Sequence, residues 1–121
     1  MRDTSPEYVE FSHRSGHLVA TVVVPSVGQA EAPTIREQIA AQLRTLPKGK
    51  AFVLDLTRVS LLSSMGLGTC VDLRNTANEA GLRPVVYGMN RHLVDLFKLM
   101  KIDRLFTVLR TQQELDDILA S

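Results

Sequence analysis

Two adjacent serines and two nearby glycines form the group of residues in this sequence whose types and spacing could support chemistry. Ser63 and Ser64 follow a short apolar pair, and Gly66 and Gly68 come soon after them. Serine hydroxyls cap helices, and a helix start points free N–H groups outward, an arrangement that suits an anion or a phosphate. The glycines would let other backbone approach the first helical turn closely. The segment therefore predicts a helix start that carries a functional surface.

This helix start follows a strand. Residues 52–54 form a short apolar run of the kind found in fully buried strands, and Asp55 and Thr57 offer turn-forming side chains at its end. We expect the strand to stop near Leu56. The glycines do not complete a dinucleotide fingerprint, and neither serine stands in the sequence context of a nucleophile. The sequence therefore predicts neither an enzyme nor a bound cofactor.

The segment from Asp55 to Gly68 resembles the signature of STAS domains, the family of the bacterial anti-sigma-factor antagonists and of related domains in sulfate transporters. The shared features are Asp55-Leu56-Thr57, the apolar pair at 61–62, the serine pair and Gly66-Leu67-Gly68. The order of elements is similar over nearly the whole chain, but only this segment is specific as a motif. The resemblance implies a protein-binding module that docks an anti-sigma factor of the protein-kinase type and thereby releases a sigma factor.

Two departures from the family pattern bear on regulation. The usual form is Asp-Ser-Ser-Gly-Leu-Gly, so Ser63 stands in place of the aspartate and Met65 in place of the phosphoacceptor serine. A thioether cannot be phosphorylated. Residues 25–28, Pro-Ser-Val-Gly, replace the Gly-Glu-Leu-Asp that often precedes the first helix, which removes an acidic residue that resembles part of the kinase contact. The resemblance therefore implies a module without the classical phospho-switch.

Ser64 remains a candidate for phosphorylation, with Ser63 beside it. In STAS relatives that build stress-signalling scaffolds, the phosphorylated residue lies one place earlier and a bulky apolar residue follows it, an arrangement that Ser64 and Met65 resemble. A phosphate there would add about two negative charges at the positive end of a helix. Capping without any regulation would account for both serines equally well.

The expected docking surface combines the start of this helix with the loop before the first helix. It consists of Ser63, Ser64, Met65, Gly66, Ser26, Gly28 and Gln29. Methionine ordinarily fills cores, but Met65 could instead be an exposed contact, and the sequence leaves open whether Leu62 or Met65 points inward. Two other functions stay open: a constitutive subunit of a signalling scaffold or lipid-transport complex, and a sensor that binds a nucleotide or lipid beside the helix start.

Composition limits the partners further. The chain has 121 residues, enough for one domain, and 45% of them are hydrophobic. A formal charge of +1, with no basic cluster interleaved with aromatics, argues against nucleic-acid binding. The single cysteine fits a reducing compartment, and no apolar run approaches the roughly 20 residues that span a bilayer. We therefore expect a cytoplasmic protein without direct membrane insertion, and a flexible N-terminus at residues 1–6.

The histidines and the cysteine predict no metal site. His13 and His17 flank a hairpin turn and His92 lies in the first turn of a helix, and no pair has the spacing of a metal site. We expect all three to be surface residues. Cys70 lies on the predicted inner face of the helix after the serines, so it is expected to be a small buried hydrophobe.

The alternation of elements predicts the fold class. β-branched and aromatic residues at 8–11 and 18–24, around Arg14-Ser15-Gly16, predict an N-terminal hairpin. Helical spacing predicts four helices. The first starts at about Thr34, where Thr34 and Glu37 could form a capping box, and the second covers 67–80 and ends at Gly81. The third follows an N-cap at Asn90, and the fourth follows a capping box of Thr111 and Glu114. Strands are expected at 84–87 and, at an edge, 105–109. The prediction is an α/β, STAS-like single domain over residues 1–121, with a mixed, mostly parallel sheet, an N-terminal β-hairpin and about four helices.

Overall fold

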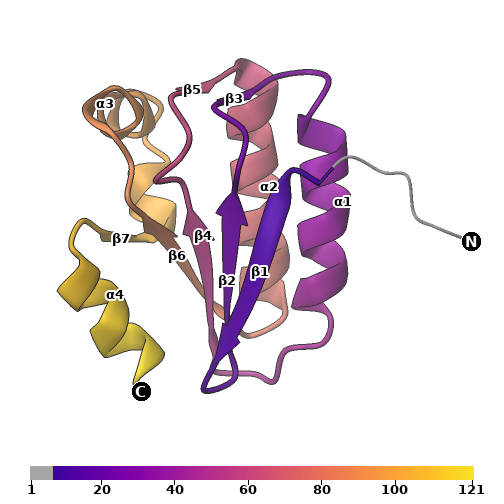
Figure 1. The fold of residues 1–121 in the computed structure, drawn as a ribbon, viewed down its shortest axis with the longest axis vertical. Helices are drawn as coiled ribbons and strands as arrows, with labels where there is room; N and C mark the ends of the chain where they lie inside the picture. Colours follow the sequence, from indigo (N-terminus) through magenta and orange to yellow (C-terminus); the bar gives the residue numbers. More distant parts are fainter. Residues whose placement is uncertain (1–6) are drawn as a thin grey trace, which may run out of the picture.

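The computed structural model describes residues 7–121, so the predicted flexible N-terminus at residues 1–6 lies outside the described residues. Its centre is a sheet of five strands in the order β1-β2-β4-β6-β7 (Figure 1). β1 pairs antiparallel with β2, and every later pairing in this sheet is parallel. The strands are β1 (Val9–Arg14), β2 (His17–Val22), β4 (Ala51–Asp55), β6 (Arg83–Tyr87) and β7 (Thr107–Leu109). The predicted mixed, mostly parallel sheet is confirmed.

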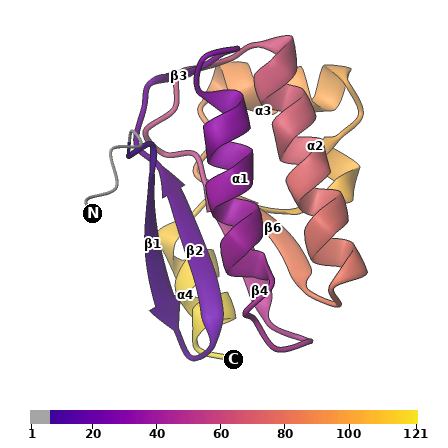
Figure 2. The ribbon, with the colours of Figure 1, turned by 90° about the vertical axis from the view of Figure 1, so that its right-hand side faces the viewer.

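Helices cover both faces of this sheet. α1 (Ala32–Leu43) and α2 (Ser64–Glu79) lie side by side on one face (Figure 2), and α4 (Gln112–Leu119) lies on the other. α3 (Arg91–Leu99) sits at the end where the parallel strands finish, and a 3-10 turn, Asp103–Leu105, follows it. A second, two-stranded parallel pair, β3 (Ser26–Val27) and β5 (Leu61–Leu62), lies at that same end. The described residues thus contain the expected α/β arrangement with four α-helices.

Alternating side chains of the central strand, β4, belong to two hydrophobic clusters. On the α1/α2 face, Phe52 and Leu54 of β4 pack in one cluster with Leu73 of α2. On the other face, Val53 packs in a second cluster with Leu115 and other residues of α4. A parallel strand covered on both faces must be apolar throughout, and this is why the run at 52–54 has no polar residue.

Local signals placed the hairpin turn and two helix N-caps correctly, whereas the edge strand predicted at 105–109 is shorter, Thr107–Leu109, because Asp103–Leu105 forms a 3-10 turn. The hairpin turn is formed by Ser15 and Gly16, both with positive φ (53° and 83°), the conformation of a type I′ turn. Asn90 caps α3 by accepting a hydrogen bond from the Leu93 N–H, and Thr111 and Glu114 form a reciprocal capping box on α4. These predictions are confirmed.

The predicted start of the first helix is wrong. α1 begins at Ala32, with Glu31 at its N-cap, so Thr34 lies inside the helix and forms no capping box with Glu37. Pro33 explains the earlier start, because its fixed φ and missing N–H suit the first helical turn. The Glu31 carboxylate instead accepts a hydrogen bond from the Gly28 N–H at 2.8 Å, which closes the loop before the helix.

The prediction that all three histidines lie at the surface is wrong for His17. Its side chain is buried, whereas His13 and His92 are exposed. The Nδ1 atom accepts the Ala51 N–H at 2.9 Å, so the ring proton lies on Nε2, which donates to the Ser121 carbonyl at 3.0 Å. His17, on β2, therefore bonds to β4 and to Ser121, the second residue after α4, and these two hydrogen bonds compensate its burial.

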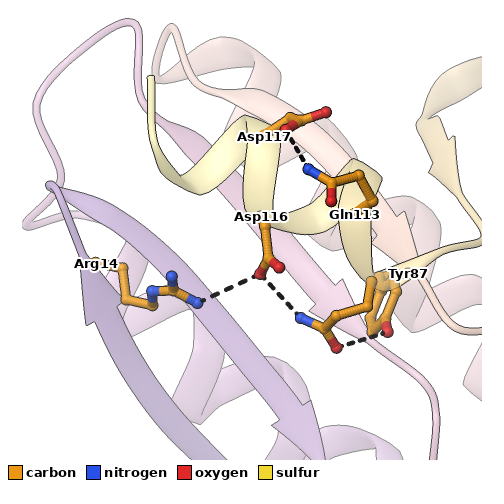
Figure 3. A network of polar contacts seen from close by, with 6 residues as sticks. Arg14, Tyr87, Gln113, Asp116 and Asp117 are labelled. Carbon is orange, nitrogen blue, oxygen red and sulfur yellow. Dashed lines mark hydrogen bonds and ion pairs between the residues drawn. The ribbon is translucent and has the colours of Figure 1, made fainter.

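Polar side chains also connect α4 to β1 and β6 (Figure 3). Asp116 lies 3.9 Å from the Arg14 guanidinium of β1 and accepts a hydrogen bond from Gln112, whose carbonyl accepts one from Tyr87 of β6. These groups are largely exposed, so each contact contributes little to stability. The buried Leu115 and Leu119, which pack in the second hydrophobic cluster, hold α4 on the sheet.

Candidate functional site

The short β3–β5 pair brings together the two segments that the sequence assigned to one surface. Ser26 pairs with Leu61 and Val27 with Leu62 in parallel register. Further backbone bonds run from Ser60 N–H to the Pro25 carbonyl (2.7 Å) and from Ser63 N–H to the Val27 carbonyl (3.0 Å). This pairing is not predictable from the sequence pattern, because two-residue strands show no periodicity. The loop at 25–28 and the start of α2 are thus one rigid unit.

Ser63 is the N-cap of α2. Its Oγ accepts a hydrogen bond from the Gly66 N–H at 3.1 Å, and its extended backbone leads into the helix. Gly66 is required by packing, since a Cβ at this position would lie 2.8 Å from the Val27 carbonyl oxygen. Gly68 differs, because nothing lies within 4 Å of the corresponding position there, so the predicted close approach of backbone is wrong for Gly68.

The structure settles which apolar residue points inward. Leu62 is buried, with 8% of its surface exposed, whereas Met65 is 46% exposed and points away from the core. Leu61 of β5, which the sequence did not single out, is 54% exposed. Ser64, in the first turn of α2, is also exposed. Two apolar side chains and one hydroxyl are therefore exposed to solvent at this end of the sheet.

The loop residues of the predicted surface differ in their accessibility. Ser26 and Gln29 are exposed, and Ser26 is the register partner of Leu61. Gly28 is half-buried and its N–H is bonded to Glu31, so it shapes the loop from within. Glu31 is the acidic group nearest in sequence to this loop, and no sequence pattern singled it out.

Asp55 organises the turn that follows β4. One carboxylate oxygen accepts the Thr57 N–H (2.9 Å) and hydroxyl (2.7 Å), and the other accepts the Thr21 hydroxyl at 3.0 Å. All these bonds are local or bridge to the neighbouring strand. Asp55 thus ends the strand as predicted and holds the following loop against β2.

Cys70 is an inert part of the core. Its side chain is 4% exposed on the inner face of α2, as the sequence predicted. Burial raises the pKa of the Cys70 thiol to about 12, so the thiol stays protonated at neutral pH. A protonated, buried thiol is a poor nucleophile and a poor metal ligand.

A groove runs between α2 and α3 beside the exposed serine. Its volume is about 340 Å³, and its lining residues are Ser64, Leu67, Gly68, Val71, Leu96, Met100 and Ile102. None of these lining side chains is charged, and the hydroxyl of Ser64 is the polar side-chain group among them. A second groove, of about 290 Å³, lies between α1 and α2 and includes Met65, Arg36 and Asp72 among its lining residues.

A sequence model described as the STAS domain matches residues 8–117. The chain belongs to the STAS domain family.

Solved structures agree with this assignment at the level of the fold. An anti-sigma-factor antagonist (STAS) domain protein from Planctomyces limnophilus is 17% identical, with a TM-score of 0.82 over 93% of this chain and 98% of that one. An anti-sigma factor antagonist from Mycobacterium paratuberculosis is 20% identical, with a TM-score of 0.77 over 91% and 92% of the two chains. The murine anion transporter Slc26a9 is 14% identical, with a TM-score of 0.72 over 87% of this STAS domain and 18% of the transporter.

Among the described residues of this STAS domain, no helix has both the length and the apolar character needed to cross a membrane. Nor do residues 7–121 bring three or more metal-binding side chains together.

Proposed function

We propose that this STAS domain is a protein-binding regulatory module of the anti-sigma-factor-antagonist type. Its docking surface would be formed by the exposed residues Ser63, Ser64, Met65, Ser26 and Gln29, extended by Leu61, while buried Gly66 and half-buried Gly28 would shape the backbone beneath it. The observation that carries the proposal is the exposure of Met65 and Leu61 on a backbone held rigid by the β3–β5 pair. Exposed apolar side chains on a preformed surface favour association, because little conformational entropy is lost on binding.

The partner would be an anti-sigma factor of the protein-kinase type. Binding would sequester it and release a sigma factor in the cytoplasm, and this STAS domain would carry out no catalytic step itself. The support is that two structural neighbours bear the name of anti-sigma-factor antagonists. Loops at the ends of a packed sheet suit such a role, since they can vary while the scaffold is held.

Phosphorylation by such a kinase would be restricted to the serine pair and would favour Ser64. Met65 occupies the place of the usual acceptor and cannot accept phosphate. The Ser63 hydroxyl is engaged as the cap of α2, whereas the Ser64 side chain is exposed. A phosphate on Ser64 would lie at the helix N-terminus, which tolerates negative charge. The same charge would weaken the binding of a partner that docks an apolar surface there.

A pull-down followed by a kinase assay tests this function. The tagged protein is retrieved from its own cells and the retained proteins are identified, with a Met65→Glu, Leu61→Glu variant as the matched control. The recovered anti-sigma factor is then incubated with the protein and ATP, and intact mass is measured. We expect a histidine-kinase-like ATPase retained by the wild type alone, and either no phosphate or phosphate on Ser64. Phosphate mapped elsewhere, with Ser64 unmodified, would contradict the assignment of Met65 to the acceptor position.

A second function is a constitutive subunit of a signalling scaffold or a lipid-transport complex, docked through the same surface without a phospho-switch. Met65 favours it, because this residue keeps the surface apolar whatever the kinase activity of the cell. Recovery of membrane-transport subunits, at equal yield from cells with and without the kinase, would support this function over the first.

A third function, binding of a nucleotide or lipid, is favoured by the groove between α2 and α3. A thermal-shift screen against both classes tests it, because a ligand that binds only the folded state must raise the melting temperature. A flat response across the screen would exclude the compounds used.

A further inference from the structure

The side chain of Asn90 makes contacts in two directions. Its Oδ1 accepts the Leu93 N–H at 2.8 Å and so caps α3. Because Oδ1 is used in this way, the amide is oriented with Nδ2 toward two carbonyls of the segment before α2, those of Ser60 (3.3 Å) and Val59 (3.5 Å). An N-cap needs only the oxygen, and aspartate or serine would supply one equally well. The NH₂ group is what asparagine adds.

Neighbouring contacts hold the same two segments together. The Leu56 N–H donates to the Tyr87 carbonyl at 2.9 Å. Gly88 has a positive φ of 78°, and a Cβ there would lie 2.1 Å from Cγ2 of Thr57, a distance that no real side chain could keep. The residues between β6 and α3 therefore pack against residues 56–60, and Asn90 is the last residue before α3.

Ser60, which Asn90 contacts, also connects to the loop of the docking surface. Its own N–H donates to the Pro25 carbonyl at 2.7 Å, and the Leu61 N–H donates to the same oxygen at 3.2 Å. Pro25 immediately precedes β3, which pairs with β5. Asn90, Ser60 and Pro25 thus form a continuous series of hydrogen bonds from the start of α3 to both halves of the docking surface.

We propose that Asn90 is a positioning residue for the docking surface: its NH₂ group holds the Ser60 carbonyl so that Leu61 and Met65 are presented together. The effect on docking rests on the proposed function, whereas the effect on the loop does not. At 3.3 and 3.5 Å the two contacts are long, so the expected role is to fix the loop's position and not to support overall stability.

Two substitutions separate this role from capping. Asn90→Asp keeps the capping oxygen but places a carboxylate oxygen against the two carbonyls, and Asn90→Ser keeps a cap that cannot reach them. Asn78→Asp, an exposed change in α2, controls for the added charge. Amide hydrogen exchange measured by NMR on the free protein reports each segment separately. We expect the Ser60 and Leu61 amides to exchange about tenfold faster in Asn90→Asp, the size of one lost hydrogen bond, and by a smaller factor in Asn90→Ser.

The Leu93 and Val94 amides of α3 should exchange at the wild-type rate in both variants. Wild-type rates at Ser60 and Leu61 in both variants would overturn the proposal, and so would a uniform acceleration that includes α3 and the sheet, since this would show a general loss of stability.

The second measurement is the affinity of each variant for the anti-sigma factor identified by pull-down, obtained by titration. If the loop is loosened and the affinity of Asn90→Asp falls at least fivefold below that of Asn78→Asp, the positioning role in docking is supported. Unchanged affinity with a loosened loop would overturn it. If the wild type itself does not bind, the proposed function fails, and with it the docking role, while the exchange rates still decide whether Asn90 holds the loop.

Discussion

The two ends of the parallel strands use their polar and apolar groups differently. At the amino end, buried His17 bonds to Ala51 and to Ser121, and the Gly49 N–H donates to the Gly81 carbonyl at 2.9 Å. At the carboxyl end, hydrogen bonds also fix the loops, but they leave Leu61 54% exposed and Met65 46% exposed. Both ends are ordered, and the exposed large apolar side chains among residues 7–121 are these two together with Leu99 and Met100 at the end of α3.

This difference separates stability from binding. Solvent contact of large apolar side chains is unfavourable in the isolated chain and becomes favourable when a partner covers them. A rigid backbone beneath such side chains reduces the entropy lost on association. We therefore expect changes in the core and at the amino end to lower the free energy of unfolding, and changes at the carboxyl end to lower partner affinity.

The largest expected effect is in the core beneath the docking surface. Leu73→Ala should lower the free energy of unfolding by roughly 2–5 kcal/mol, because the fully buried side chain leaves a cavity. Asn75→Ala, at an exposed position of the same helix, should change it by about 0.5 kcal/mol or less. Urea denaturation measures both. Equal stability of the two variants would mean that α2 is rotated from its described orientation.

The next effect is at the amino end. His17→Leu removes the acceptor of the Ala51 N–H and the donor to Ser121, and should cost about 1–3 kcal/mol through the unsatisfied buried group. His13→Leu, on the same hairpin but exposed, serves as the control and should cost much less. Partner affinity should be unchanged by either, as isothermal titration would measure. A loss of affinity in folded His17→Leu would break the proposed separation of the two ends.

Within the serine pair, capping and binding should divide between the two residues. Ser63→Ala should cost about 1 kcal/mol because it removes the acceptor of the Gly66 N–H. Ser64→Ala should leave the free energy of unfolding nearly unchanged, since no hydrogen bond of its side chain supports the helix start. If chemical denaturation ranked the two variants in the opposite order, the cap would have been assigned to the wrong serine.

Ser64→Asp should change the free energy of unfolding by about 1 kcal/mol or less, because negative charge is tolerated at the start of a helix. The same charge on the docking surface should reduce partner affinity tenfold or more, about 1.4 kcal/mol. Asn78→Asp, farther along α2, is the charge-matched control. Equal affinities of wild type and Ser64→Asp would remove Ser64 from the surface.

The smallest effect concerns acid stability on the α4 side. N–H groups of Arg110 and Thr111 donate to the Glu114 carboxylate and lower its pKa below the usual 4.5. A carboxyl whose pKa is lowered on folding stabilises the fold above its usual pKa, and this contribution is lost as pH falls through the folded value. Glu114→Gln should therefore show a slightly smaller loss of stability between about pH 6 and about pH 3 than the wild type. A larger loss would contradict the assigned capping box.

The sequence predicted what local chemistry determines. The cap at Asn90, the box at Thr111 and Glu114 and the Ser15-Gly16 turn each depend on residues within a few positions of one another. The fold class followed from the alternation of elements, and the STAS resemblance at Asp55 to Gly68 identified the segment that the structure places at the carboxyl end.

Contacts distant in sequence could not be predicted in the same way. The hydrogen-bond partners that allow His17 to be buried lie 34 and 104 residues away in the sequence. Nothing near His17 in the sequence indicates them. The strands β3 and β5 have two residues each, too few to show a hydrophobic period in the sequence. Whether Leu62 or Met65 points inward depends on how α2 joins β5, and the second role of Asn90 depends on a loop 30 residues away.

The central claim is that partners dock at the carboxyl end of the sheet. Its most direct test is an NMR titration of the isotope-labelled protein with the anti-sigma factor recovered by pull-down, which follows the backbone amides of every element. The account predicts that the largest shifts fall on residues 26–29 and 60–66 and that residues 13–17, 49–51 and 112–121 stay unperturbed. Shifts concentrated on α4 or on the hairpin turn, with residues 60–66 unchanged, would contradict it.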